Sequence, residues 1–190
     1  MSDAAPQRIY LDHAATTPPR DEVRDAMAAA CERWGNPSAH ATEGRRAREA
    51  LDEARDSIQR SLGAGAYDVV FTSGGTEANV SAVVGAALSS TSLSGTAVRR
   101  VWVSAVEHPS ILDAESLLAR LGVSLSRLPV DSGGRVEIDA VRDACGEGAA
   151  SLAVMAANNE VGTLQPVSTI AELARESGAL FHCDAVQWGA

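Results

Sequence analysis

The chain has 190 residues, of which 45% are hydrophobic and 22% charged, and its formal net charge is -9 at pH 7. This length and apolar content favour a folded protein with a sizeable core and argue against disorder. The acidic balance argues against a non-specific nucleic-acid or anionic-membrane binder, since such proteins need a basic face. We therefore expect neither nucleic acid nor membrane among its partners. A local arginine cluster is expected to form the solvated face of a helix, with contact to an anion as the alternative: Arg45, Arg46 and Arg48.

The sequence contains no stretch that resembles a signal peptide and no run of about 18 apolar residues that would span a bilayer. Its three cysteines, Cys31, Cys145 and Cys183, are odd in number and lack CxxC spacing. They indicate neither a disulfide framework nor a zinc site, so we expect no metal and a cytoplasmic, reduced protein. The 16 basic residues are all arginines, and the sequence has no lysine.

The first third of the chain is predicted to be helical. A helix over residues 20–33 ends at the turn signal Gly35-Asn36-Pro37. A second helix over residues 47–62 carries an apolar stripe at 3.6-residue spacing and stops at Gly63.

From residue 69 onward, short apolar runs alternate with helical patterns. Strands are predicted at 69–71, 101–103, 125–130, 151–156 and 179–183. Helices are predicted at 76–88, 109–121, 138–145 and 167–177, with a Ser/Thr/Gly-rich surface loop at 89–97. Apolar strands alternating with amphipathic helices predict an α/β fold, with a largely parallel sheet and helices on both faces. Ligands of such sheets collect at the carboxyl ends of the strands.

The stretch Ser73–Glu77 lies between a predicted strand and a helix. Gly74 and Gly75 let a ligand approach the backbone, and the start of the helix offers unpaired N–H groups and the positive end of its dipole. With the hydroxyl of Thr76, these groups would form a phosphate cradle, although the stretch is neither a GxGxxG nor a Walker loop. The alternative is an ordinary glycine turn with Thr76 as the helix cap.

Three further polar stretches follow predicted strands. His108 would stack on an aromatic ring or exchange protons near neutral pH, or else be purely structural. The adjacent amides of Asn158 and Asn159 would donate to a phenolate or carboxylate oxygen, although asparagine-rich turns are common. Asp184 would pair with a cation such as a protonated pyridine nitrogen, with Gln187 reaching a neighbouring ring oxygen; a helix-capping aspartate is the alternative. Together, the polar stretches at the strand ends fit a phosphorylated, protonatable aromatic ring.

Six motifs run in order along the chain: Tyr10-Leu-Asp-His-Ala-Ala-Thr-Thr-Pro18, Gly35-Asn-Pro-Ser38, Phe71-Thr-Ser-Gly-Gly-Thr-Glu-Ala-Asn79, Glu107-His-Pro-Ser-Ile-Leu112, Asn158-Asn-Glu-Val-Gly162 and His182-Cys-Asp-Ala-Val-Gln187. On these motifs the chain resembles the NifS/IscS-type cysteine desulfurases, which are class-V aminotransferase-like enzymes of pyridoxal phosphate (PLP) fold-type I. The resemblance implies that residues 1–190 form the N-terminal part of an incomplete PLP-binding large domain. Residues 1–15 would be its N-terminal segment, and the small C-terminal domain would be absent.

The resemblance implies PLP as cofactor and a role in binding it for several residues. Gly75 and Thr76 would hold its phosphate. Asp184 would pair with the pyridinium nitrogen, so that the ring withdraws electrons from the substrate. Gln187 would bond the ring hydroxyl oxygen.

The resemblance also implies residues that act on the substrate. His108 would be catalytic, stacking on the cofactor ring and shuttling a proton. Asn159 would lie between the ring oxygen and the substrate carboxylate. Asn36 would approach the substrate, and the loop that it shares with His40 would approach the substrate or a partner subunit.

Enzymes of this family take sulfur from L-cysteine, leaving alanine and a persulfide on an enzyme cysteine, for iron–sulfur cluster assembly or tRNA thiolation. This reaction also needs a Schiff-base lysine, which the sequence lacks, and a cysteine on a loop, which none of its three cysteines fits. The chain alone is therefore expected to be inactive, and the full-length enzyme to be a homodimer that meets a sulfur-acceptor or scaffold protein. Another fold-type I aminotransferase or lyase, and a non-catalytic fragment, are the alternatives.

Overall fold

The computed structural model describes residues 9–89 and 99–188. The chain divides into two compact units, Met1–Phe71 and Thr72–Ala190, and each is described by itself below. Apart from Ser89, the loop predicted at 89–97 lies outside the described residues. Within the described ranges, no helix combines the length and the apolar character needed to cross a membrane.

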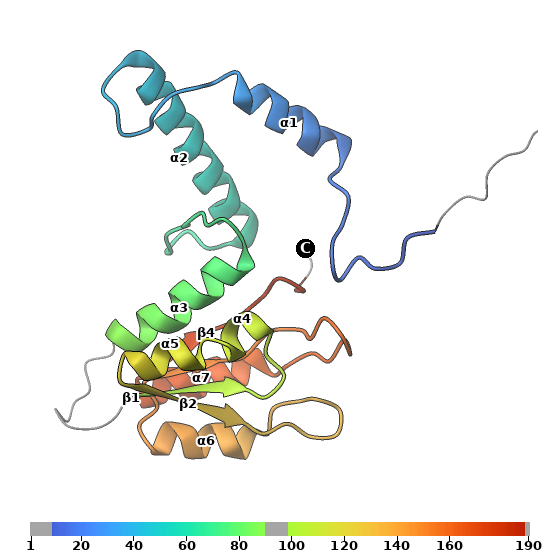
Figure 1. The fold of residues 1–190 in the computed structure, drawn as a ribbon, viewed down its shortest axis with the longest axis vertical. Helices are drawn as coiled ribbons and strands as arrows, with labels where there is room; N and C mark the ends of the chain where they lie inside the picture. The colour runs from blue at the N-terminus through green and yellow to red at the C-terminus, as the bar shows by residue number, and fades with distance from the viewer. Residues whose placement is uncertain (1–8, 90–98, 189–190) are drawn as a thin grey trace, which may run out of the picture. The chain divides into compact units, whose positions relative to one another are not determined.

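The first unit contains two helices, α1 (Asp21–Cys31) and α2 (Thr42–Leu62) (Figure 1). None of the residues of α1 is buried, and in α2 only Gly44 is. The predicted end of the second helix is confirmed, since Gly63 follows α2 with a φ of 63°. Glycine adopts this left-handed conformation without a steric penalty, so the helix stops there.

The loop that joins α1 to α2 packs tightly on the start of α2. A Cβ atom added to Gly44 would lie 2.5 Å and 2.6 Å from two carbonyl oxygens of this loop, so only glycine fits. Arg45 donates to the carbonyl oxygen of His40 at 2.7 Å, and Arg48 donates to that of Pro37 at 2.9 Å. Two members of the arginine cluster therefore hold the loop, in addition to facing solvent.

The predicted strand over residues 69–71 is wrong. These residues have no regular structure; Val70 is 79% exposed and Phe71 is 45% exposed. A strand requires a neighbour to complete its hydrogen bonds, and none of the described strands pairs with this run. The guanidinium of Arg55 lies 5.7 Å from the centre of the Phe71 ring instead.

The second unit is built on a four-stranded sheet with the order β2-β1-β3-β4, in which all pairs are parallel. The strands are β1 (Arg99–Ser104), β2 (Val123–Leu128), β3 (Ser151–Ala153) and β4 (Leu180–His182). The other four predicted strands are therefore present, and the expected parallel α/β arrangement is confirmed.

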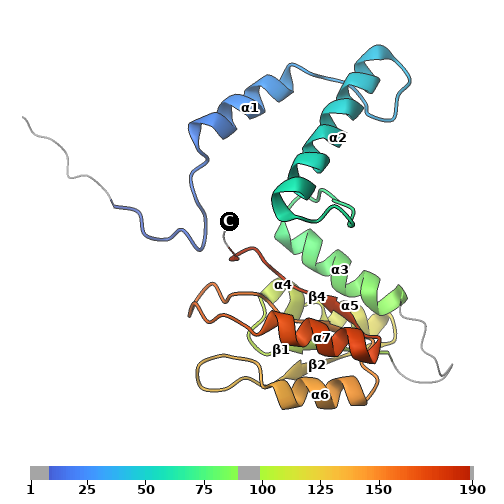
Figure 2. The same ribbon diagram turned by 180° about the vertical axis from the view of Figure 1, so that it is seen from behind.

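Five helices cover the two faces of this sheet (Figures 1 and 2). They are α3 (Gly75–Ser89), α4 (Pro109–Leu112), α5 (Glu115–Arg120), α6 (Ile138–Gly146) and α7 (Val167–Ser177). Helices α3, α4 and α5 share one core cluster with the side chains of Val101 and Val103, whereas α6 and α7 pack in a second cluster with Trp102. Successive strand residues point to opposite faces, so helices on both faces are confirmed.

The single helix predicted over residues 109–121 is wrong in one respect, because it is divided into α4 and α5. The residues between them keep helical backbone angles, with φ and ψ of -75° and -11° at Asp113 and -67° and -9° at Ala114. The N–H of Ala114, however, donates to the carbonyl oxygen of Ile111 at 3.2 Å, which is three residues back, where a regular α-helix bonds four residues back. This tighter turn interrupts the series of α-helical hydrogen bonds. The spacing of apolar residues alone does not reveal such an interruption.

Candidate functional site

The strand order of the second unit reverses between β1 and β3, since β2 lies on one side of β1 and β3 on the other. In open parallel sheets, such a reversal leaves a crevice at the carboxyl ends of the two strands. Here, residues 106–109 after β1 and residues 158–161 after β3 line one hollow. The fold therefore brings His108 and Asn159 to the same crevice, as the sequence predicts.

The two adjacent asparagines of this crevice have different surroundings. The Oδ1 atom of Asn158 accepts the N–H groups of Glu160 at 2.9 Å and Val161 at 3.0 Å, and its Nδ2 donates to the carbonyl oxygen of Val106 at 3.1 Å. Asn158 therefore shapes the loop. Asn159 is exposed and lines the hollow together with Asn158.

The start of α3 presents Gly75 and Thr76 at its exposed first turn. The N–H of Ala78 is the first to bond back into the helix, to the carbonyl oxygen of Gly74 at 3.1 Å. The N–H groups before it have no acceptor within the helix, which is the arrangement that binds anions. Because Thr76 is the second residue of α3, it is not the helix cap that the alternative requires.

A carboxylate reaches back over the beginning of the same helix. One oxygen of Glu77 accepts both the N–H of Ser73, at 2.7 Å, and its hydroxyl, at 2.6 Å. Both bonds lower the pKa of Glu77, and the bond from the hydroxyl has the larger effect. The contact satisfies the N–H and the hydroxyl of Ser73 and fixes the entry of the chain into α3.

Asp184 follows the end of β4, and its carboxylate is held from two sides. Its Oδ1 atom accepts the N–H of Val186 at 3.0 Å, and its Oδ2 atom accepts Nδ2 of Asn79 at 2.7 Å. Of residues 185–188, which the structure describes after Asp184, none is helical. Gln187 is half-buried, and its role toward a ring oxygen stays a prediction.

Asn79 is a central residue of this site, although it is not one of the site residues predicted from the sequence. Its side chain is only 5% exposed, and its amide also contacts Ser110 Oγ at 3.0 Å and His182 Nε2 at 2.9 Å. A signal was present in the sequence. Asn79 shares one face of α3 with the buried Val83 and Ala87, and a polar residue on an apolar stripe needs hydrogen-bond partners.

Glu107, beside His108, is a second buried group that is not among the predicted site residues. It is 4% exposed, and its Oε1 atom accepts the hydroxyl of Ser104 at 2.5 Å and the N–H of Met155 at 2.7 Å. Its Oε2 atom is buried without a hydrogen-bond partner in the described structure. Burial raises the pKa of Glu107 to about 7, although the two hydrogen bonds to Ser104 and Met155 lower it. The negative charge of Asp184 raises it further.

The chemistry of Cys183 follows from its neighbours. Burial, followed by the charges of Glu107 and Asp184, raises the pKa of the Cys183 thiol to about 11. A thiol of this kind is not ionised near neutral pH and is a poor nucleophile. Burial also lowers the pKa of His182, against the opposing charge of Asp184.

Asn36 and His40 belong to the first unit. The Oδ1 atom of Asn36 accepts the N–H of Ser38, and its carbonyl oxygen accepts that of Ala39, both at 2.9 Å. The backbone of His40 is held by Arg45. The loop is therefore ordered by its own hydrogen bonds, and its contact with substrate stays a prediction.

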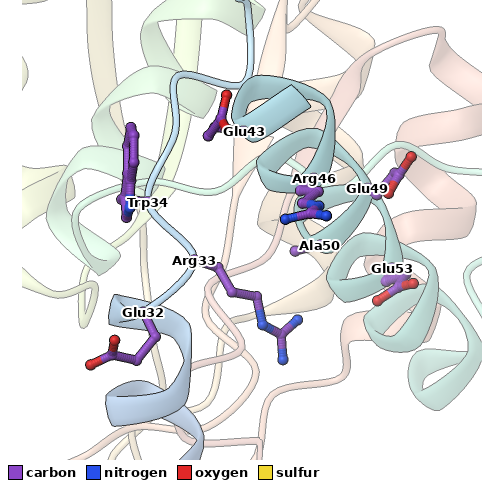
Figure 3. Close-up of a pocket in the computed structure, with 8 residues that line it drawn as sticks. All are labelled: Glu32, Arg33, Trp34, Glu43, Arg46, Glu49, Ala50 and Glu53. Atoms are coloured by element: carbon purple, nitrogen blue, oxygen red, sulfur yellow. The ribbon is translucent and has the colours of Figure 1, made fainter. Parts of the chain in front are cut away.

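A hollow in the first unit lies beside the beginning of α2 (Figure 3). Its lining includes four glutamates, two arginines and Trp34: Glu32, Glu43, Glu49, Glu53, Arg33 and Arg46. The excess of carboxylates disfavours a phosphate or another anion there. None of the predicted site residues lines it. Among the described residues, no group of three or more His, Cys, Asp or Glu side chains is placed to hold a metal ion.

These features define a parallel α/β protein with a polar site at its strand ends and at the start of a helix. The family model of the class-V aminotransferases matches residues 9–189, and the chain belongs to this family. It is 40% identical over 182 residues to the cysteine desulfurase IscS of Dictyoglomus turgidum, and this match covers 95% of the chain and 45% of that protein.

Two solved structures have the same fold. One is a NifS-like protein, with a TM-score of 0.83 and 30% identity over 95% of this chain and 49% of the other. The second is SspA in complex with cysteine, with a TM-score of 0.80 and 30% identity over 92% and 49% of the two chains. The chain spans about half the length of the proteins that it matches.

Proposed function

We propose that this chain supplies the cofactor-binding part of a PLP-dependent cysteine desulfurase. The observation that carries this proposal is the carboxylate of Asp184, held at the end of β4 by the buried amide of Asn79 at 2.7 Å. A fixed, half-buried carboxylate is suited to a cationic ring nitrogen. The cysteine desulfurase names of the relatives support this reading over other PLP-dependent reactions.

The residues present fit the cofactor at both of its ends. Gly75 and Thr76 would bind the phosphate through the first turn of α3, where N–H groups lack acceptors within the helix. Asp184 would accept a hydrogen bond from the ring nitrogen, and Gln187 would bond the ring hydroxyl oxygen. When bound, PLP supplies an electron-withdrawing ring that labilises bonds at the substrate Cα.

The substrate that we propose is L-cysteine. His108 would move a proton at the substrate side of the crevice, and Asn159 would orient the substrate carboxylate with its exposed amide. The Asn36 loop is proposed to approach the same substrate. In the overall reaction, the Cβ–S bond of cysteine breaks, and the sulfur passes to an enzyme thiolate as a persulfide, with alanine as the other product.

The remaining catalytic groups are proposed to come from outside these 190 residues. The sequence has no lysine to hold PLP covalently. Cys183, with a pKa of about 11, does not meet the need for a thiolate. From the resemblance to the cysteine desulfurases, we propose that the complete enzyme is a homodimer that passes sulfur to an acceptor or scaffold protein. The three free cysteines support a reducing compartment such as the cytoplasm.

The test is a titration of the purified chain with PLP, followed by absorbance and equilibrium dialysis. One equivalent should bind non-covalently, and Asp184→Asn should weaken binding by roughly 10- to 100-fold, since a bond to a charged group is lost. Asp139→Asn is the matched control, because this aspartate is exposed on α6 and should leave the affinity unchanged. No binding by the parent chain, or equal affinity of Asp184→Asn, would contradict the proposal.

A further inference from the structure

A chain of hydrogen bonds runs through the second unit and links Asp184 to His108. Asn79 Nδ2 donates to Asp184 Oδ2 at 2.7 Å and to Ser110 Oγ at 3.0 Å. Ser110 Oγ in turn lies 2.8 Å from His108 Nδ1. The connection joins α3, the loop after β4 and the start of α4, with the buried Asn79 at its centre.

The direction of the bonds at Asn79 is determined by chemistry. An ionised carboxylate only accepts hydrogen bonds, so the amide nitrogen of Asn79 must face Asp184, and its oxygen then faces His182. His182 Nε2, at 2.9 Å from that oxygen, must therefore carry a hydrogen. The two hydrogens of the amide nitrogen serve Asp184 and Ser110, so each polar atom of this side chain is used.

The same direction continues to His108. The hydroxyl oxygen of Ser110 accepts from Asn79, so its own hydrogen is free to point at His108 Nδ1. The backbone N–H of Ser110 also donates to this nitrogen at 3.1 Å. With two donors directed at it, Nδ1 is the acceptor nitrogen of the neutral imidazole, and the ring hydrogen must lie on Nε2.

We propose that Asn79 is a positioning residue that couples the two ring-binding groups: it holds the Asp184 carboxylate and, through Ser110, fixes His108 as the Nε2–H tautomer. The inference deepens the proposed function, on which the catalytic meaning of His108 and Asp184 rests. His108 would then meet the crevice with an N–H donor at Nε2, while Nδ1 remains engaged within the protein. Every group in this hydrogen-bond chain belongs to the protein itself.

The test reads the tautomers directly, by ¹⁵N NMR of histidine-labelled protein without cofactor at alkaline pH. The sequence has four histidines, and a His108→Gln variant assigns the signal of interest. In the parent chain, Nδ1 of His108 should be unprotonated and Nε2 protonated. His182 should show the same tautomer and serves as an internal reference in each variant.

Ser110→Ala removes one of the two donors to Nδ1, and the ratio of the Nδ1–H to the Nε2–H form should rise roughly fivefold. Asn79→Asp has almost the same shape but offers Ser110 an acceptor, which should turn the hydroxyl away from His108 and raise the ratio similarly. The His182 tautomer should not change, since an oxygen still faces it. Ser81→Ala, on the exposed face of α3, is the control and should leave both histidines unchanged.

A parent His108 with its hydrogen on Nδ1, or an unchanged ratio in Ser110→Ala or in a folded Asn79→Asp, would overturn the proposal. Should Asn79→Asp not fold beside the Asp184 carboxylate, the ratio in Ser110→Ala decides. Since no cofactor is added, a failure here is separate from a failure of PLP binding in the Asp184→Asn titration.

Discussion

The two compact units differ in how they bury their apolar side chains. The second unit has two core clusters on opposite faces of its sheet, in which residues such as Leu118 and Leu152 are fully buried. The first unit has helices with apolar stripes, yet many of its large apolar side chains remain open to solvent. Those at least 60% exposed are Ile9, Leu11, Met27, Trp34, Leu62, Tyr67 and Val70. An amphipathic pattern therefore predicts a helix, but it provides stability only when another surface covers the apolar face.

The largest expected effect is the loss of stability on truncating one buried leucine of the second unit. Leu152→Ala, in the centre of β3, should lower the free energy of unfolding of the second unit by about 2–5 kcal/mol, because it leaves a cavity. Met27→Ala, at a 64% exposed position of α1, should change the free energy of unfolding of the first unit by less than about 0.5 kcal/mol. Urea denaturation followed by circular dichroism measures both values. Equal losses would show that the first unit has a core of its own.

The second expected effect is that the stability of the second unit depends on pH through the buried Glu107. The pKa of Glu107 is 4.5 ordinarily and about 7 in the fold, so between these values the folded chain binds more protons than the unfolded one. The free energy of unfolding should therefore fall as pH rises through this window, by a total of about 3 kcal/mol.

Glu107→Gln keeps the shape of the protonated side chain and should remove most of this slope, measured by urea denaturation across the pH range. Glu172→Gln, at an exposed position of α7, should keep the slope of the parent chain. A slope that persists in Glu107→Gln would assign the effect to another group.

The smallest expected effect concerns the tightest packing in the first unit. Gly44→Ala would place a Cβ atom 2.5 Å from a carbonyl oxygen, so the loop before α2 must move, at a cost of about 1–3 kcal/mol. Amide hydrogen exchange at the first turn of α2 should become faster. Gly65→Ala, whose Cβ atom would meet nothing within 4 Å, should leave the exchange unchanged. Unchanged exchange in Gly44→Ala would show that this loop is already loose.

Much of the fold could be predicted from local sequence signals. Helix α2 ends where Gly63 follows with a positive φ, as the sequence predicts, and α7 ends in the same way before Gly178. The run at residues 69–71 has the composition of a strand, but strand formation depends on a neighbour that composition does not specify. The break at Ala114 depends on one shifted hydrogen bond, to which the spacing of apolar residues is insensitive.

The residues at the ends of the strands could be predicted from the sequence, whereas the hydrogen bonds that join the site residues could not. Motifs place His108 and Asn159 at strand ends, and the sheet order then brings them to one crevice. The role of Asn79 depends on partners 31 and 105 residues away in the chain, at Ser110 and Asp184. Pairings at such separation are set by the tertiary fold, so no local pattern reveals them.

The large separation in sequence between Asn79 and its partner Asp184 also bears on the order in which the protein folds during its synthesis. Its bond to Asp184 spans 105 residues, so it forms only after β4 has left the ribosome and joined the edge of the sheet. Until then, water takes the place of Asp184 beside the amide of Asn79, whereas Ser110, 31 residues along the chain, is synthesised earlier. The polar centre of the site therefore closes late, when the strands that surround it are already synthesised.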